Sequence, residues 1–124
     1  MTEIQPVLTC RDAPAAVEFY KRAFGADELE RHENPNGIVS ELALEGARFM
    51  VVDEVPEAFN LSPATLGGTS VRIHLLVDDP DAFVARAIGE GATEVFPIAD
   101  QPYGLRQGRI QDPYGHHWLV GRPI

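Results

Sequence analysis

The sequence predicts an α+β domain built from two copies of a β-α-β-β-β unit. Each half of the chain carries, in the same order, a short apolar strand pattern, an amphipathic helix pattern and three further strand patterns. The halves also match at an offset of 66 residues, which pairs Pro14 with Pro80 and Gly25 with Gly91. Because one unit of this size cannot cover the apolar face of its own sheet, we expect both units to combine in a single domain over residues 1–124.

Module one comprises residues 1–53 and begins with a strand over residues 4–10, where Pro6 indicates a sheet edge. The helix that follows begins at Asp12, whose side chain can cap it, and ends at Gly25. Three strands complete the module, separated by an Asn-Pro-Asn-Gly turn and a Glu-Gly turn: 26–32, 38–44 and 48–53.

Residues 54–70 lack periodicity and contain two prolines and a Gly-Gly pair, so they are predicted to connect the modules. Module two comprises residues 71–124 and repeats the order, with a strand over 71–77 and a helix from Asp79 to Glu90. Three more strands follow: 93–97, 105–111 and 116–121.

Composition narrows the classes of partner. With 10 Lys and Arg against 19 Asp and Glu, the chain carries a net charge of −9, which disfavours nucleic acid and anionic membrane surfaces and is compatible with cationic ligands. No apolar run is long enough to span a membrane, and the N-terminus lacks a signal-peptide pattern. The lone Cys10 cannot form an internal disulfide, and its alternation with Leu8 predicts a buried thiol. We therefore expect a cytoplasmic protein.

A family resemblance covers almost the whole chain. It rests on the runs RD at 11–12, AVEFY at 16–20, FGA at 24–26, LGGT at 66–69, HLLVDD at 74–79, GEGA at 89–92 and DPYGH at 112–116. These runs resemble the vicinal oxygen chelate superfamily, which includes glyoxalase I, bleomycin resistance proteins and extradiol dioxygenases, and most of all its PhnB-like branch. The resemblance implies the glyoxalase/bleomycin resistance fold, in which two curled mixed sheets surround a cavity, usually in a homodimer.

In enzymes of the superfamily, four side chains bind a divalent metal. The resemblance places these positions at Gln5, Met50, Arg72 and Leu119. None offers the imidazole or carboxylate that such metals prefer, and a guanidinium repels a cation, so no metal or other cofactor is predicted. Two alternatives stay open. A one-residue shift of register in module two would invert its faces, and a displaced metal site could use His74, Glu41 and His117.

Strand alternation predicts which side chains face the cavity. Ile73 and Leu75 suit packing against helices, which turns Arg72 and His74 the other way. Trp118 alternates with the inward-facing positions and is expected in the core. The predicted ligand-binding residues share the inward face or the cavity mouth: Gln5, Val7, Glu41, Arg48, Met50, Arg72, His74, Tyr103, His117 and Leu119.

Two of these residues are candidates for catalysis. Arg72 can hold a carboxylate, phosphonate or enolate oxygen by paired hydrogen bonds, or it can pair with Glu41 and merely close the cavity. His74 can transfer protons, or it can line the wall as a hydrogen-bonded side chain. No nucleophile or partner dyad accompanies it at a fixed spacing.

The leading hypothesis is a metal-independent, homodimeric binding protein that sequesters a small organic or antibiotic ligand, as bleomycin resistance proteins do. The alternative is an enzyme of the superfamily, a lyase, isomerase or dioxygenase, with a displaced metal site or none. A third hypothesis is an interaction subunit whose cavity is closed. Fold alone cannot decide among them, because one scaffold hosts unrelated chemistries.

Overall fold

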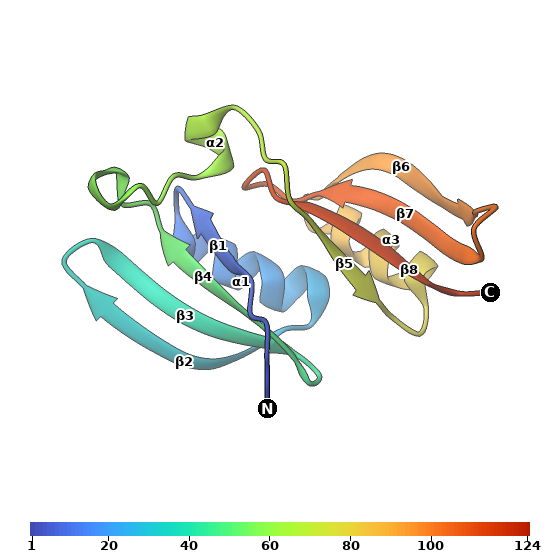
Figure 1. Cartoon of the computed structure of the whole chain (residues 1–124), viewed down its shortest axis with the longest axis horizontal. Coiled ribbons are helices and arrows are strands. Elements are labelled where there is room, and N and C mark those ends of the chain that lie inside the picture. The colour runs from blue at the N-terminus through green and yellow to red at the C-terminus, as the bar shows by residue number, and fades with distance from the viewer.

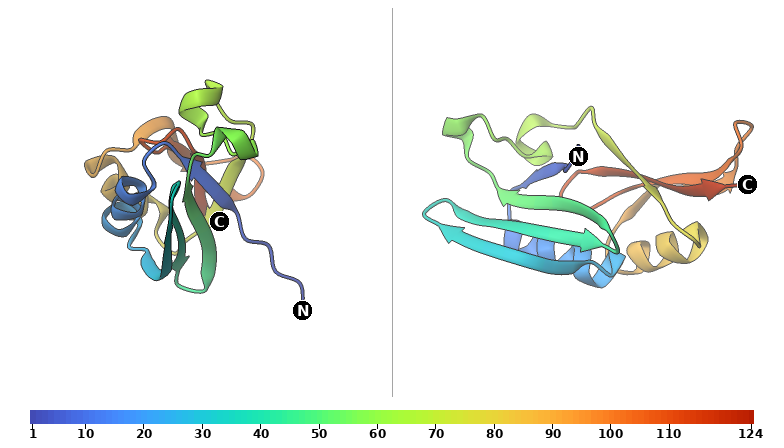
Figure 2. Two further views of the ribbon diagram at one scale, coloured as in Figure 1. Left: turned by 90° about the vertical axis from the view of Figure 1, so that its left-hand side faces the viewer. Right: turned by 60° about the horizontal axis from the view of Figure 1, so that its bottom comes forward.

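The structure of residues 1–124, a computed structural model, contains two four-stranded mixed sheets (Figure 1). Sheet one has the order β1 (Val7–Cys10), β4 (Ala47–Asp53), β3 (Gly37–Leu44), β2 (Asp27–Asn34). Sheet two has the order β5 (Arg72–Leu76), β8 (His117–Pro123), β7 (Leu105–Gln111), β6 (Thr93–Asp100). The helices α1 (Ala13–Phe24) and α3 (Pro80–Gly89) lie on the same side of the two sheets (Figure 2). The predicted α+β fold with two β-α-β-β-β modules is confirmed.

The helix boundaries follow from the capping residues. Asp12 and Asp79 accept hydrogen bonds from the backbone N–H of Ala15 and Ala82, both at 3.1 Å, and so begin α1 and α3. Gly25 ends α1 in the left-handed conformation, with φ 73°. Helix α1 has 12 residues and α3 has 10. The number of residues that separates equivalent positions of the two modules is therefore larger at the starts of the helices than at their ends.

The offset at the helix starts, 67 residues, sets the register of the first strands. Val7 pairs with Met50 in sheet one, and His74 pairs with Leu119 in sheet two. Arg72 thus corresponds to Gln5 and His74 to Val7. On β5, Arg72 and His74 are exposed and alternate with the partly buried Ile73, so the alternative of a shifted register is wrong.

Two strand boundaries differ from the expectation. The first strand begins at Val7 rather than at residue 4, so Gln5 precedes it. The strand expected to end at Pro97 continues to Asp100, with irregular pairing between Glu94 and Ala99. β6 is an edge strand, where a proline without an N–H costs no sheet hydrogen bond.

The connector is ordered by its own contacts. It contains a 3-10 helix, η1 (Pro56–Ala58), and a short helix, α2 (Pro63–Leu66). Glu54 accepts hydrogen bonds from the backbone N–H and the hydroxyl of Ser62, at 2.8 and 2.9 Å. No helix in the chain combines the length and apolar character that crossing a membrane requires.

One hydrophobic core joins both modules on the helix side of the sheets. Trp118 of β8 is 1% exposed, and its ring centroid lies 5.7 Å from that of Tyr20 and 4.9 Å from that of Phe24, both in α1. Cys10 is fully buried in the same core. The predicted core positions of Trp118 and Cys10 are confirmed.

A buried carboxylate links the modules within this core. Asp112, 3% exposed, accepts hydrogen bonds from the Tyr20 hydroxyl at 2.5 Å and the Trp118 indole N–H at 2.9 Å. It also accepts from the backbone N–H of Tyr114 and His116, at 2.9 and 3.1 Å. Burial and the Asp112 charge raise the pKa of Tyr20 well above its usual value, so the phenol remains a hydrogen-bond donor.

Replacing this carboxylate should destabilise the whole chain. Asp112→Ala leaves a buried phenol and a buried indole without acceptors, so we expect it to lower the free energy of unfolding by about 3 kcal/mol. Urea denaturation followed by circular dichroism measures the change. Asp100→Ala is the matched control, because Asp100 is exposed and pairs only with Arg106. Similar effects of the two substitutions would contradict the role assigned to Asp112.

Candidate functional site

The candidate site lies on the side of each sheet that faces away from α1 and α3. We call this side the helix-free face. On sheet two this face borders a hollow of about 440 Å³. Adjacent strands supply its central side chains, Arg72 from β5, Leu119 from β8 and Arg109 from β7. Phe96 of β6 and Tyr103 of the following turn, 61% and 63% exposed, add aromatic surface.

A chain of hydrogen bonds orients His74. The Tyr103 hydroxyl donates to Gln107 Oε1 at 2.6 Å, which turns Gln107 Nε2 toward His74 Nε2, 3.1 Å away. An amide nitrogen can only donate, so His74 Nε2 accepts and the ring proton resides on Nδ1. His74 therefore presents an N–H donor.

Arg109 determines which ring nitrogen of a second histidine, His117, carries the proton. Its Nε donates to His117 Nδ1 at 3.0 Å, so the neutral ring of His117 carries its proton on Nε2. Burial and the Arg109 charge lower the pKa of His117 below its usual value. His117 is thus a second neutral N–H donor on this face.

Arg72 has no carboxylate partner. Within one chain the expected alternative, an ion pair with Glu41, does not form, because Glu41 lies in sheet one and its carboxylate is 3.6 Å from the Arg48 guanidinium. Arg72 instead lies beside His117 in the register of sheet two. Its guanidinium is available to a ligand.

The predicted site residues divide between the two sheets. Sheet two and its β6–β7 turn carry Arg72, His74, Tyr103, His117 and Leu119. Sheet one carries Val7, Glu41, Arg48 and Met50, and Gln5 precedes β1 and donates to Glu3 at 3.0 Å. Within one chain these groups do not surround a common cavity, because the hollow at Arg72 is lined by module two alone. A smaller hollow of about 330 Å³ lies under the connector. Of the predicted site residues, only Val7 and His117 line it.

The side chains at the metal positions of the superfamily do not fit a divalent metal. Leu119 has no donor atom, Arg72 is positive, and Gln5 and Met50 offer only an amide and a thioether. Within one chain the displaced site expected from His74, Glu41 and His117 does not assemble, since Glu41 lies in the other sheet. No group of three or more His, Cys, Asp or Glu side chains lies close enough to hold a metal ion.

Sequence reasoning missed Phe96, Gln107 and Arg109. A signal for the two β7 residues was present, because the buried Ile110 fixes the alternation of β7 and turns Gln107 and Arg109 away from the core. Phe96 carried no such signal, since the irregular pairing of β6 breaks the alternation on which its face depends.

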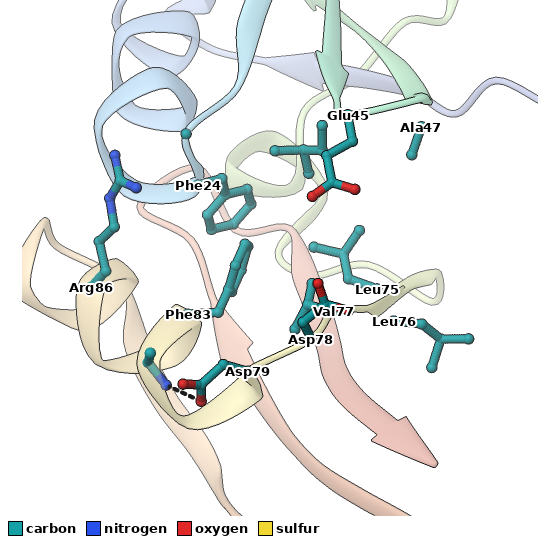
Figure 3. Close-up of a pocket in the computed structure, with 13 residues that line it drawn as sticks. Phe24, Glu45, Ala47, Leu75, Leu76, Val77, Asp78, Asp79, Phe83 and Arg86 are labelled. Carbon is teal, nitrogen blue, oxygen red and sulfur yellow. Dashed lines mark hydrogen bonds between the residues drawn. The ribbon is translucent and has the colours of Figure 1, made fainter.

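A third hollow, of about 500 Å³, lies at the seam between the modules (Figure 3). Phe24 and Phe83 pack against each other there with ring centroids 5.0 Å apart. Figure 3 shows Glu45 extending from the β3–β4 turn toward the side that holds Leu75 and Asp78. None of the predicted site residues lines this hollow, because its walls come together only when the two modules pack.

Comparisons with known proteins agree with this architecture. A family model described as a glyoxalase-like domain matches residues 5–120. The uncharacterized protein Mb0911c of Mycobacterium bovis is 43% identical over 126 aligned residues, covering 98% of this chain and 83% of that protein. The crystal structure of TioX from Micromonospora sp. ML1 is 32% identical, with a TM-score of 0.76 and coverage of 98% and 100%. That of TnmS3, an antibiotic binding protein from Streptomyces sp. CB03234, has a TM-score of 0.71 at 24% identity, with coverage of 99% and 98%, and shows a similar fold.

The contact between Arg109 and His117 predicts a measurable titration. We expect the His117 ring resonances to titrate with a midpoint below the usual histidine value in nuclear magnetic resonance spectra. Arg109→Gln removes a positive neighbour that disfavours the imidazolium, so the midpoint should rise. Arg122→Gln, which removes a charge outside the hollow, is the control. A midpoint that Arg109→Gln leaves in place would contradict the assigned contact.

Proposed function

We propose that this chain, which belongs to the glyoxalase-like domain family, is a metal-independent protein that binds a small organic molecule on the helix-free faces of its sheets. One observation carries the proposal: on the helix-free face, hydrogen-bond donors are present where enzymes of the superfamily have metal ligands. The metal positions hold side chains that do not suit a divalent metal, and the guanidinium groups of Arg72 and Arg109 line a hollow on the same face. The similarity to TnmS3, described as an antibiotic binding protein, is consistent with sequestration of such a ligand.

We further propose a homodimer in which the module-one face of one copy covers the module-two face of its partner. In a single chain both helix-free faces are open, and Val7, Phe96 and Tyr103 are each more than half exposed. A second copy would bury this apolar surface and turn the open hollow into an enclosed cavity. The fully buried, unpaired Cys10 agrees with a reducing compartment, and we propose a cytoplasmic location.

The enzyme hypothesis finds less support in these side chains. Proton transfer by His74 would require a ring nitrogen free to accept, but Nε2 already accepts from Gln107 and Nδ1 carries the proton. His74 is thus arranged to donate a hydrogen bond to a bound molecule. This arrangement favours recognition of a ligand over its chemical conversion.

The metal-independent function predicts indifference to divalent ions. Incubation with Ni²⁺, Zn²⁺, Mn²⁺ or Fe²⁺ should leave the melting temperature unchanged, and elemental mass spectrometry should find substoichiometric metal in the purified protein. A ligand that prefers the folded state raises its stability by mass action. One metal per cavity with a raised melting temperature would overturn this part of the proposal. Treatment with a chelator, which should also leave the melting temperature unchanged, is the control.

The homodimer predicts the mass of two chains in light scattering coupled to size-exclusion chromatography. Phe96→Asp introduces a charge into the covered face, so we expect it to shift the equilibrium toward the mass of one chain. Phe59→Asp is the matched control, because Phe59 lies on the connector and is 90% exposed. A single-chain mass at all concentrations, or equal behaviour of the two variants, would speak against this arrangement.

A further inference from the structure

We propose that the ligand is an organic anion with a flat apolar body, such as an aromatic carboxylate, whose acidic group lies between Arg72 and Arg109. This inference rests on the proposed binding function and specifies the chemical class of its ligand. It reverses the expectation of a cationic ligand that the overall charge of −9 suggests.

The side chains that line the hollow on sheet two offer mostly donors, with the amide oxygen of Gln101 as an acceptor. Gln107 Oε1 accepts from Tyr103, and the Gln107 backbone carbonyl accepts from Gln101 Nε2 at 3.0 Å. Arg72 and Arg109, which both line the hollow, carry only donors. A ligand with oxygen acceptors can satisfy these groups, whereas an ammonium ligand would leave them unpaired.

The charge of the hollow is positive although the molecule is acidic. Four arginines have carboxylates within 4 Å: Arg22, Arg31, Arg48 and Arg106. Arg72 and Arg109 have none, and no Asp or Glu lines the hollow that they share. Two uncompensated guanidinium groups beside one hollow attract an anion, and a planar carboxylate matches their hydrogen-bonding geometry.

The strand register places the two guanidinium groups on either side of an apolar floor. Arg72 lies on β5 and Arg109 on β7, with β8 between them. Leu119 of β8 pairs with Arg109 and lies next to the strand of Arg72. Two strand spacings and the two-residue stagger between His117 and Leu119 set the two arginine backbones about 12 Å apart, so one carboxylate can lie between their side chains above Leu119.

Aromatic side chains complete one wall of the hollow. Phe96 and Tyr103 border it, and the Tyr103 hydroxyl is already held by Gln107, so both rings present apolar surface. In the proposed dimer, the face opposite comes from sheet one of the partner copy. That face carries Val7 and Met50 beside the Glu41–Arg48 pair, whose charges offset each other. The cavity therefore combines one cationic wall with one largely apolar wall, which suits an amphiphilic acid.

Three naphthalene probes test the charge of the ligand on the full chain. Naphthoate, naphthamide and naphthylmethylammonium share one ring system and differ in the charge of the head group. In isothermal titration calorimetry we expect naphthoate to bind at least about tenfold more tightly than naphthamide, and the ammonium probe most weakly. Raising the ionic strength should weaken naphthoate binding only.

Three variants of matched chemistry test the assigned residues. Arg72→Gln and Arg109→Gln should each weaken naphthoate binding by about tenfold and change naphthamide binding by less than about twofold. Arg122→Gln removes the same charge outside the hollow and should leave both affinities unchanged. Since Arg72 has no ion-pair partner, the melting temperature of Arg72→Gln should match that of the unmodified chain.

The possible outcomes distinguish a failure of the anion assignment from a failure of the proposed binding function. Equal binding of naphthoate and naphthamide, or tighter binding of the ammonium probe, overturns the anion assignment and leaves small-molecule binding in place. Equal weakening by Arg72→Gln and Arg122→Gln overturns the assignment of the hollow. Failure of all three probes to bind contradicts the proposed function together with the ligand class.

Discussion

The buried carboxylate of Asp112 is the interaction on which the arrangement of the two modules depends. It accepts from a phenol in α1 and from an indole in β8, so one side chain joins the helix of module one to the sheet of module two. His116, four residues later, reaches the backbone carbonyl of Thr9 in β1 at 2.9 Å. A buried carboxylate is stable only when its oxygens are hydrogen-bonded, so the two modules must keep the Tyr20 hydroxyl and the Trp118 indole within reach of Asp112.

The position of this junction explains why the binding surface is open. Because α1, α3 and the shared core occupy one side of both sheets, the helix-free faces have no partner within the chain (Figure 2). Alternation along each strand then separates the two kinds of side chain. Trp118 and Val120 enter the core, while His117 and Leu119 of the same strand face outward. The core and the proposed binding surface therefore occupy opposite sides of the same strands.

The sequence predicted well whatever depends on local rules. Asp12 and Asp79 begin the helices as expected, and alternation placed Arg72 and His74 on the helix-free face. It did not place residues of different modules relative to one another, as with Arg72 and Glu41, which lie in different sheets and do not meet within one chain. The seam hollow at Glu45 and Asp78 was missed for the same reason, since no periodicity encodes how two modules approach one another.

Arg72 connects the departure from the superfamily with the proposed ligand. The resemblance to the superfamily places a metal ligand of its enzymes at this position, and a bound divalent metal carries positive charge that attracts oxygen atoms. Here the side chain itself is the cation, and a guanidinium binds oxygen through N–H donors without acting as a Lewis acid. The proposed site would thus attract oxygen anions without a Lewis acid to activate them. This change is the physical reason to expect a binding protein on a scaffold that elsewhere supports catalysis.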